Sequence, residues 1–232
     1  PDAGGELVYG KTNVEFDRGA ILAMGRPHSP AATWGPGQVD VTPDGRANPT
    51  AIPDLRPVRL QSHLHWAGTL RNSLPALAVR IDTLLVTTLN QQLRPPRIVS
   101  FALAYYLWHL SRPHTDPPGP KLDAHQRRGA ALFEETCTRC HRPDGTAAQP
   151  VPAERVGTDP AVARSPTRGT GLYRIPSLRG VADRTQLLHD GSVDSLHALL
   201  APDRPARTPG HPWGTDLTAH QRRALVDYLE TL

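Results

Sequence analysis

The stretch Cys137-Thr138-Arg139-Cys140-His141 decides the fold of this chain. It has the pattern Cys-x-x-Cys-His, and its two cysteines are the only ones in the sequence. Two residues between the thiols let both reach the edge of one haem from a single helical turn and form thioethers. The adjacent histidine is then placed to ligate the iron. The sequence therefore predicts one covalent c-type haem, attached at Cys137 and Cys140 with His141 as an iron ligand.

Two other kinds of site use paired cysteines at this spacing. A redox dithiol does not need the histidine that follows the second cysteine. A zinc site needs two more soft ligands at finger-like spacing, and the sequence has no further cysteine. Both alternatives explain fewer of the residues than haem attachment does.

The composition agrees with a fold built around a cofactor. Of the 232 residues 38% are hydrophobic, so the protein part of the core is modest, and a haem would add a large apolar body to it. The 25 prolines and 19 glycines predict short helices joined by irregular loops. We therefore expect an all-α, cytochrome c-like fold with long Pro/Gly-rich loops.

The net charge and the hydropathy of the chain indicate which kinds of partner it can bind. The net charge of +4 suits docking to an acidic partner or pairing with haem propionates, and no basic run is interleaved with aromatics as in nucleic-acid binding. No stretch is long and apolar enough to span a membrane.

The chain begins at Pro1 rather than at a methionine, which suggests processing or truncation. Because thioether attachment happens outside the cytoplasm in bacteria, we expect a periplasmic or otherwise extracytoplasmic protein.

Before the cysteines, the pattern predicts loop followed by two helices. Residues 1–50 are rich in breakers, apart from a short apolar run at 20–24. Residues 74–93 carry apolar residues near the 3.6 period, and residues 97–110 form a second, aromatic-rich helix. The proline-rich stretch 112–120 follows as a stiff linker.

After this linker, three more helices are expected. Asp123 can cap a helix that runs to Cys137, residues 193–200 form a short helix, and Thr218 can cap the final helix, 219–232. The first and last of these would hold the haem attachment loop between them.

The two parts of the chain repeat one pattern. Residues 52–58 read IPDLRPV, and 123 residues later residues 175–181 read IPSLRGV. Residues 102–110 match residues 224–232 at an offset of 122. Two such blocks at nearly one offset indicate a duplicated domain. We therefore expect two related domains, 1–116 without a haem motif and 117–232 with one.

The second copy resembles the di-haem cytochrome c peroxidase and MauG superfamily, and most of all its branch with rubber oxygenases. The resemblance rests on residues 175–181 and on residues 188–196, which read LHDGSVDSL, with the haem motif upstream. It implies two c-type domains, one haem moving electrons and the other meeting peroxide or oxygen. Here there is one motif instead of two. A second haem would therefore belong to a segment upstream of Pro1 or to a partner chain, or the first domain has lost its haem. The resemblance leaves open whether calcium bridges the domains, because no carboxylate cluster is distinctive.

The sequence does not decide which residue is the second iron ligand. His189 is the first choice because it lies on a tight turn before Asp190 and Gly191, which can bring an imidazole over a ring face. His211 is the next candidate. Met24 is the only methionine and lies in the other half of the chain. Many peroxidases of the superfamily have a methionine ligand after the stretch 188–196, and this chain has none there.

Two further residues are predicted to contact a haem. Arg179 can donate two hydrogen bonds to a propionate, or pair with a surface aspartate. Trp66 stands opposite His189 in the repeat and cannot ligate iron, because its indole nitrogen is only a donor. Beside a haem it would leave one coordination position open; otherwise it is a core residue.

The function expected from these residues is electron transfer between one covalent haem and a partner haem or redox protein. The alternative is a part of a di-haem, peroxidase- or oxygenase-like oxidoreductase whose reactive haem is bound upstream or by a partner chain. The number of covalent haems in the intact complex discriminates between the two.

Overall fold

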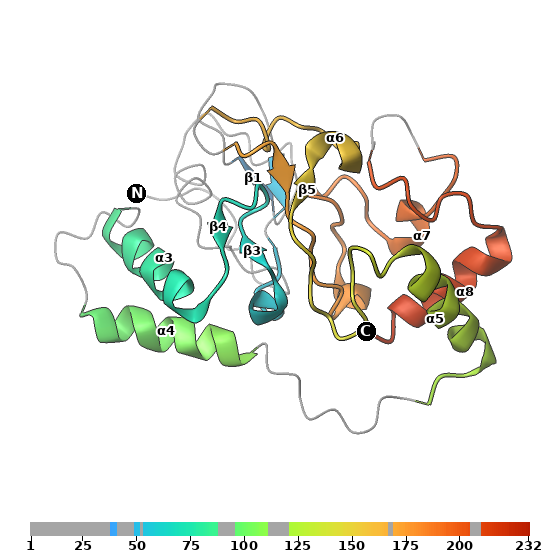
Figure 1. The fold of residues 1–232 in the computed structure, drawn as a ribbon, viewed down its shortest axis with the longest axis horizontal. Coiled ribbons are helices and arrows are strands. Elements are labelled where there is room, and N and C mark those ends of the chain that lie inside the picture. Colours follow the sequence, from blue (N-terminus) through green and yellow to red (C-terminus); the bar gives the residue numbers. More distant parts are fainter. Residues whose placement is uncertain are drawn as a thin grey trace.

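The computed structural model describes residues 38–40, 49–51, 53–87, 96–110, 121–166, 169–204 and 210–232 (Figure 1). Its helices are α3 (Leu74–Thr87), α4 (Arg97–Leu110), α5 (Ala124–Thr136), α6 (Ala153–Val156), α7 (Leu196–Leu199) and α8 (Ala219–Leu229), with short 3-10 turns η1 (Val58–Leu60) and η2 (Val181–Asp183). In the described part of the chain, no helix is long and apolar enough to cross a membrane.

Helices α5 and α8 pack against each other and frame the haem motif (Figure 1). Both begin at the predicted N-cap residues: Asp123 accepts from the backbone of Gln126, and Thr218 accepts from the backbone of Gln221. In each helix the cap is part of a capping box, which the sequence analysis did not predict. The crossing is close because Gly129 has no side chain. A Cβ there would lie 1.9 Å from the carbonyl oxygen of Ala224.

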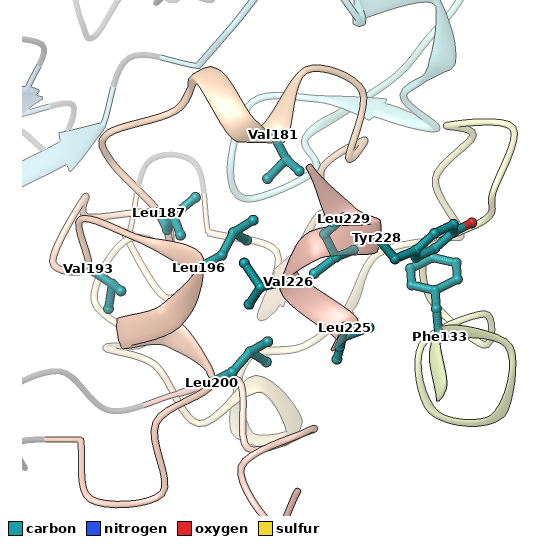
Figure 2. Close-up of a cluster of buried hydrophobic side chains, with 10 residues drawn as sticks. All are labelled: Phe133, Val181, Leu187, Val193, Leu196, Leu200, Leu225, Val226, Tyr228 and Leu229. Carbon is teal, nitrogen blue, oxygen red and sulfur yellow. The ribbon is translucent and has the colours of Figure 1, made fainter. Parts of the chain in front are cut away.

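The main hydrophobic core lies beside this crossing (Figure 2). Val226 and Leu225 of α8 are 0% and 1% exposed, and they point toward apolar residues from η2, α7 and the connecting loops. On the other side of α8, the ring of Tyr228 packs on Phe133 of α5, with ring centroids 5.4 Å apart. Burial on this scale stabilises by about 2 kcal/mol for each large apolar side chain.

A second, smaller core holds α3 and α4 together. It contains Val58, Leu64, Leu77, Ile81 and Ala104. Helix α4 has the predicted bounds. The predicted helix 74–93 is described as far as Thr87, and the rest of it lies outside the described residues.

The fold is mainly helical and cytochrome c-like, but three short antiparallel pairs were not predicted. They are β1 (Gln38–Asp40) with β2 (Pro49–Ala51), β3 (His63–Leu64) with β4 (Leu70–Arg71), and β5 (Val151–Pro152) with β6 (Leu172–Tyr173). The helix predicted over 193–200 is shorter. Val193 pairs with Leu187 and Ser195 caps α7, so helical geometry begins only at Leu196.

The same turn occurs twice at the predicted offset. Leu64 pairs with Leu70, and 123 residues later Leu187 pairs with Val193. The residue after Leu64 and the residue after Leu187 have φ values of 62° and 67°, and the glycines three positions further have 60° and 65°. The repeated sequence thus gives the same local backbone in both places.

The two parts of the chain contact each other through backbone hydrogen bonds. The amide of Ala51 donates to the carbonyl of His189 at 2.7 Å, and the amide of Arg174 donates to the carbonyl of Trp66 at 2.9 Å. The run 20–24 and the linker 112–120 lie outside the described residues. The boundary between residues 116 and 117 therefore stays a prediction.

Candidate haem site

A cavity of about 780 Å³ lies between α5, α7 and α8. This volume is within the range of about 300–1,000 Å³ that cofactor sites occupy. Most of the wall is aliphatic or aromatic. The lining also includes both cysteines of the motif, three histidines and two tryptophans, namely Cys137, Cys140, His141, His189, His211, Trp66 and Trp213.

The Cys-x-x-Cys-His motif forms a tight turn at the end of α5. Cys137 is the C-cap residue, and the amides of Cys140 and His141 both donate to its carbonyl, at 3.0 and 2.9 Å. The motif thereby presents both thiols and the imidazole to one cavity. Burial raises the pKa of the Cys137 thiol to about 11. Redox dithiols and thiolate ligands have lowered pKa values instead, so the raised pKa of Cys137 favours neither of these two alternatives.

His141 has the orientation of a haem ligand. Its Nδ1 lies 3.1 Å from the carbonyl oxygen of Pro176, to which a protonated Nδ1 donates. This hydrogen bond leaves Nε2 with its lone pair for a metal. Burial lowers the pKa of the imidazole to about 3, which keeps the ring neutral.

His211 lines the same cavity as His141. The two ring centroids are 6.4 Å apart, with an angle of 43° between the ring planes. Two imidazoles on one metal ion have nearly this separation: bonds of about 2 Å and about 1 Å from each nitrogen to its ring centre give about 6 Å. The Nδ1 atom of His211 is buried and has no hydrogen-bond partner among the described residues. Burial also lowers the pKa of His211, to about 4.

The backbone around His211 is unusual and tightly held. His211 has a φ of 51°, a conformation that side chains rarely adopt, and its amide donates to Val156 at 2.8 Å. Gly210 has a φ of 107°, and a Cβ there would lie 2.7 Å from the Cβ of Thr158. The guanidinium of Arg204 donates to the carbonyl of Gly210. These contacts fix the position of the imidazole in the cavity.

His189 lines the same cavity but has protein partners. It is 5% exposed, its ring centroid lies 4.5 Å from that of Tyr173, and its Nδ1 lies 3.3 Å from the hydroxyl of Thr158. The one histidine ring found in contact range of His141 is that of His211, in the part of the chain that the structure describes. Met24 lies outside the described residues.

Trp66, from the first part of the chain, lines the cavity. Its Nε1 donates to the carbonyl of Ala51 at 2.7 Å, and the guanidinium of Arg174 lies 4.8 Å from the ring centroid. The tryptophan therefore faces the same cavity as the haem motif.

The arginines that line the cavity differ from the predicted one. Arg179 is absent from the lining, and its side chain lies beside Gly145. The arginines that line the cavity are Arg139, Arg155, Arg174 and Arg184, and of these Arg174 is 5% exposed. Burial lowers the pKa of Arg184 to about 10, and its Nε is buried without a partner among the described residues. Arg174 directly precedes the repeated stretch 175–181, and this position was the sequence feature that could have identified it as a cavity residue. No sequence pattern singled out Arg184.

The residues present fit a haem. The cavity offers two cysteines on one turn, two imidazoles whose ring centroids lie 6.4 Å apart, and buried guanidiniums for carboxylates. No group of three His, Cys, Asp or Glu that could hold a bare metal ion occurs within the described ranges.

Comparison with known proteins agrees with a haem site in this part of the chain. Residues 126–232 match the model of the family Cytochrome c. Among solved structures, the fold is similar to that of a MauG-like protein associated with microbial copper homeostasis. The TM-score is 0.57 and the identity 18%, over 82% of this chain and 75% of that chain. A comparison with curated proteins finds no match. Residues 126–232 are therefore similar to cytochrome c domains, and the chain shares its fold with this MauG-like protein.

Proposed function

We propose that the chain transfers electrons through one covalent haem, attached at Cys137 and Cys140 and ligated by His141 and His211. Bound there, the haem supplies a reversible one-electron couple. The protein supplies the two thiols, two neutral imidazoles and a dry cavity. The partner is another haem-bearing chain or redox protein, outside the cytoplasm.

The separation between the rings of His141 and His211 carries this proposal. At 6.4 Å between centroids, one metal ion fits between the imidazoles. Two protein ligands leave no position on the iron for peroxide or oxygen. This arrangement favours electron transfer over substrate chemistry at this haem. Ligation by two histidines also gives a lower reduction potential than ligation by histidine and methionine.

Buried positive charge supports a place for the carboxylates of the cofactor. Arg174 and Arg184 line the cavity, and the pKa of Arg184 is lowered because burial disfavours its charged form. A propionate beside these guanidiniums would restore the favourable interactions that the charges lose on burial. We propose Arg174 and Arg184 as propionate partners in place of Arg179.

The decisive experiment compares His211→Ala with His189→Ala in the purified holo-protein. We expect the wild type and His189→Ala to be low-spin in visible and electron paramagnetic resonance spectra. His211→Ala should become high-spin and bind added carbon monoxide when reduced, because one face of the iron is opened. The opposite pattern would assign His189 as the ligand, and a far-red sulfur-to-iron band would assign a methionine.

Counting haems tests the alternative of a di-haem oxidoreductase. Electron transfer by this chain predicts one covalent haem per chain in a denaturing mass measurement. It also predicts no high-spin signal in the native complex. Two covalent haems in the intact complex, one of them high-spin, would favour the enzyme.

A further inference from the structure

The first part of the chain places a buried carboxylate in the contact between the two parts. The side chain of Asp54 is only 2% exposed. One of its oxygens accepts from the backbone amide of Arg56 at 2.8 Å, and the other accepts from the Nε of Arg56 at 2.7 Å. Arg56 also donates to Asp183, in the second part of the chain, at 3.1 Å. Because a carboxylate is rarely buried without positive charge around it, Asp54 indicates a cationic environment at this contact.

The repeat shows that the local turn does not need the charge of Asp54. At the offset of 123, Asp54 corresponds to Ser177 and Arg56 to Arg179. The hydroxyl of Ser177 accepts from the amide of Arg179 at 3.2 Å, as Asp54 accepts from the amide of Arg56. A serine therefore supports the same turn, and the carboxylate of Asp54 adds a negative charge that the turn does not require.

Asp54 and Arg56 lie against the 3-10 turn η2, which ends at Arg184. Arg184 is the C-cap residue of η2 and directly follows Asp183, to which Arg56 donates. At the start of η2, a Cβ on Gly180 would lie 3.4 Å from a guanidinium nitrogen of Arg56. The pair of Asp54 and Arg56 therefore packs along η2, and Arg184 at the end of this turn lines the haem cavity.

The second part of the chain leaves the charge of Arg184 poorly compensated. One terminal nitrogen donates to the carbonyl of Arg179 at 2.8 Å, whereas Nε is buried without a partner among the described residues. Burial lowers the pKa of Arg184 to about 10. The charge of Asp54 acts in the opposite direction, and the charges of Arg174 and Arg56 lower the pKa further. Asp54 therefore neutralises part of a positive charge in the cavity wall.

We propose that Asp54 sets the reduction potential of the haem by neutralising part of the charge of Arg184. This inference rests on the proposed haem attachment and on Arg184 as a propionate partner. With Asp54 in place, the guanidinium divides its favourable interactions between this carboxylate and a propionate. The positive charge that acts on the haem is then smaller, which favours the oxidised, more positive iron. Asp54 is thus a positioning residue that the part of the chain without a haem motif supplies to the haem domain.

The experiment measures the reduction potential of the purified holo-protein by spectroelectrochemistry. Asp54→Ser removes the charge and keeps an acceptor for the turn, and Asp54→Asn is a second variant of nearly the same size. Either change should shift the redox equilibrium at least about threefold toward the reduced haem, or about 28 mV at about 59 mV per tenfold for one electron. The haem should stay low-spin. An unchanged or lower potential would overturn the proposal, and failure of both variants to fold would assign Asp54 a structural role instead.

The matched control removes another carboxylate that bonds to the same arginine. Asp183→Asn takes away one negative charge and one partner of Arg56, but Asp183 is 46% exposed. Its shift should be less than half of that in Asp54→Ser, because water and salt screen an exposed charge. An equal shift in the two variants would mean that the net charge of the protein sets the potential, which contradicts a specific role of Asp54.

A double-mutant cycle tests whether Asp54 acts through Arg184. Arg184→Gln alone should lower the reduction potential, because it removes a positive charge from the cavity wall. In this background, Asp54→Ser should cause less than half of the shift that it causes in the wild-type background. Equal shifts in both backgrounds would mean that Asp54 acts on the haem directly, and the role of Arg184 in the proposal would be wrong.

Failure of the proposed function gives a different result from failure of this inference. A denaturing mass without a covalent haem, or a high-spin iron in the native wild type, would contradict the proposed electron transfer and this inference with it. A covalent, low-spin haem with the same potential in the wild type and in Asp54→Ser would overturn only the role of Asp54.

Discussion

Helices α4 and α8 carry the same short pattern, Ala-Leu-x-x-Tyr-Leu, yet the two are buried very differently. Leu225 of α8 is 1% exposed, and its equivalent Leu103 of α4 is 42% exposed. Leu225 lines the cavity and belongs to the main core, which also contains Phe133 of α5. The difference teaches that the periodic pattern determines a helix with an apolar side. How much of that side is buried depends on which other elements the fold supplies.

The largest effect is expected from truncating the two equivalent leucines. Leu225→Ala should lower the free energy of unfolding by about 2–5 kcal/mol, because it leaves a cavity beside a fully buried site. Leu103→Ala should lower it by about 1 kcal/mol or less, since much of this side chain already contacts water. Denaturant unfolding of the holo-proteins measures both. Equal losses would mean that Leu103 is covered in solution by something that binds α4.

A smaller effect is expected from enlarging the equivalent alanines. Ala224 is 1% exposed, so Ala224→Leu forces a larger side chain into a filled site and should lower the free energy of unfolding by about 1–3 kcal/mol. Ala102→Leu adds a side chain on the open face and should change it by less than about 0.5 kcal/mol. The same unfolding measurement checks the pair. A destabilising Ala102→Leu would contradict the view that α4 is open in the isolated protein.

The smallest effect is expected at the caps of the α5–α8 pair. Asp123→Ala and Thr218→Ala each remove a side-chain acceptor from a helix N-terminus and should cost about 1 kcal/mol. Both helices begin with a full capping box, so the two losses should be similar. Thermal unfolding with matched Asp123→Asn and Thr218→Ser controls, which keep an acceptor, checks this. A loss that persists in the controls would assign the effect to something other than capping.

Local features of the fold were predictable because their causes lie within a few residues. The caps at Asp123 and Thr218, the bounds of α4 and the start of α8 all follow from neighbouring side chains. The short strand pairs were missed because two-residue strands leave almost no period in a sequence. The helix predicted from residue 193 begins later, since Val193 is held by a bridge to Leu187.

The choice of a second iron ligand shows what the sequence alone could not predict. His189 was ranked first for its tight turn, and it does line the cavity, but Tyr173 and Thr158 contact it there. His211 lies in a loop whose conformation depends on Val156, Thr158 and Arg204. No spacing in the sequence reports contacts between such distant segments. Only the three-dimensional structure shows that the ring centroid of His211 lies 6.4 Å from that of His141.

By itself, the sequence predicted that a haem attaches at Cys137 and Cys140 with His141 beside it, because this chemistry needs only five consecutive residues. It also determined the helices that flank the motif and the repeated turn, since caps, periodicity and left-handed positions are local. Only the tertiary structure decided that Trp66, Arg174, Arg184 and His211 meet in one cavity, and that Leu103 of α4 is far more exposed than its equivalent Leu225 of α8. Burial and contact depend on the whole packed chain, and the sequence order does not contain these distances.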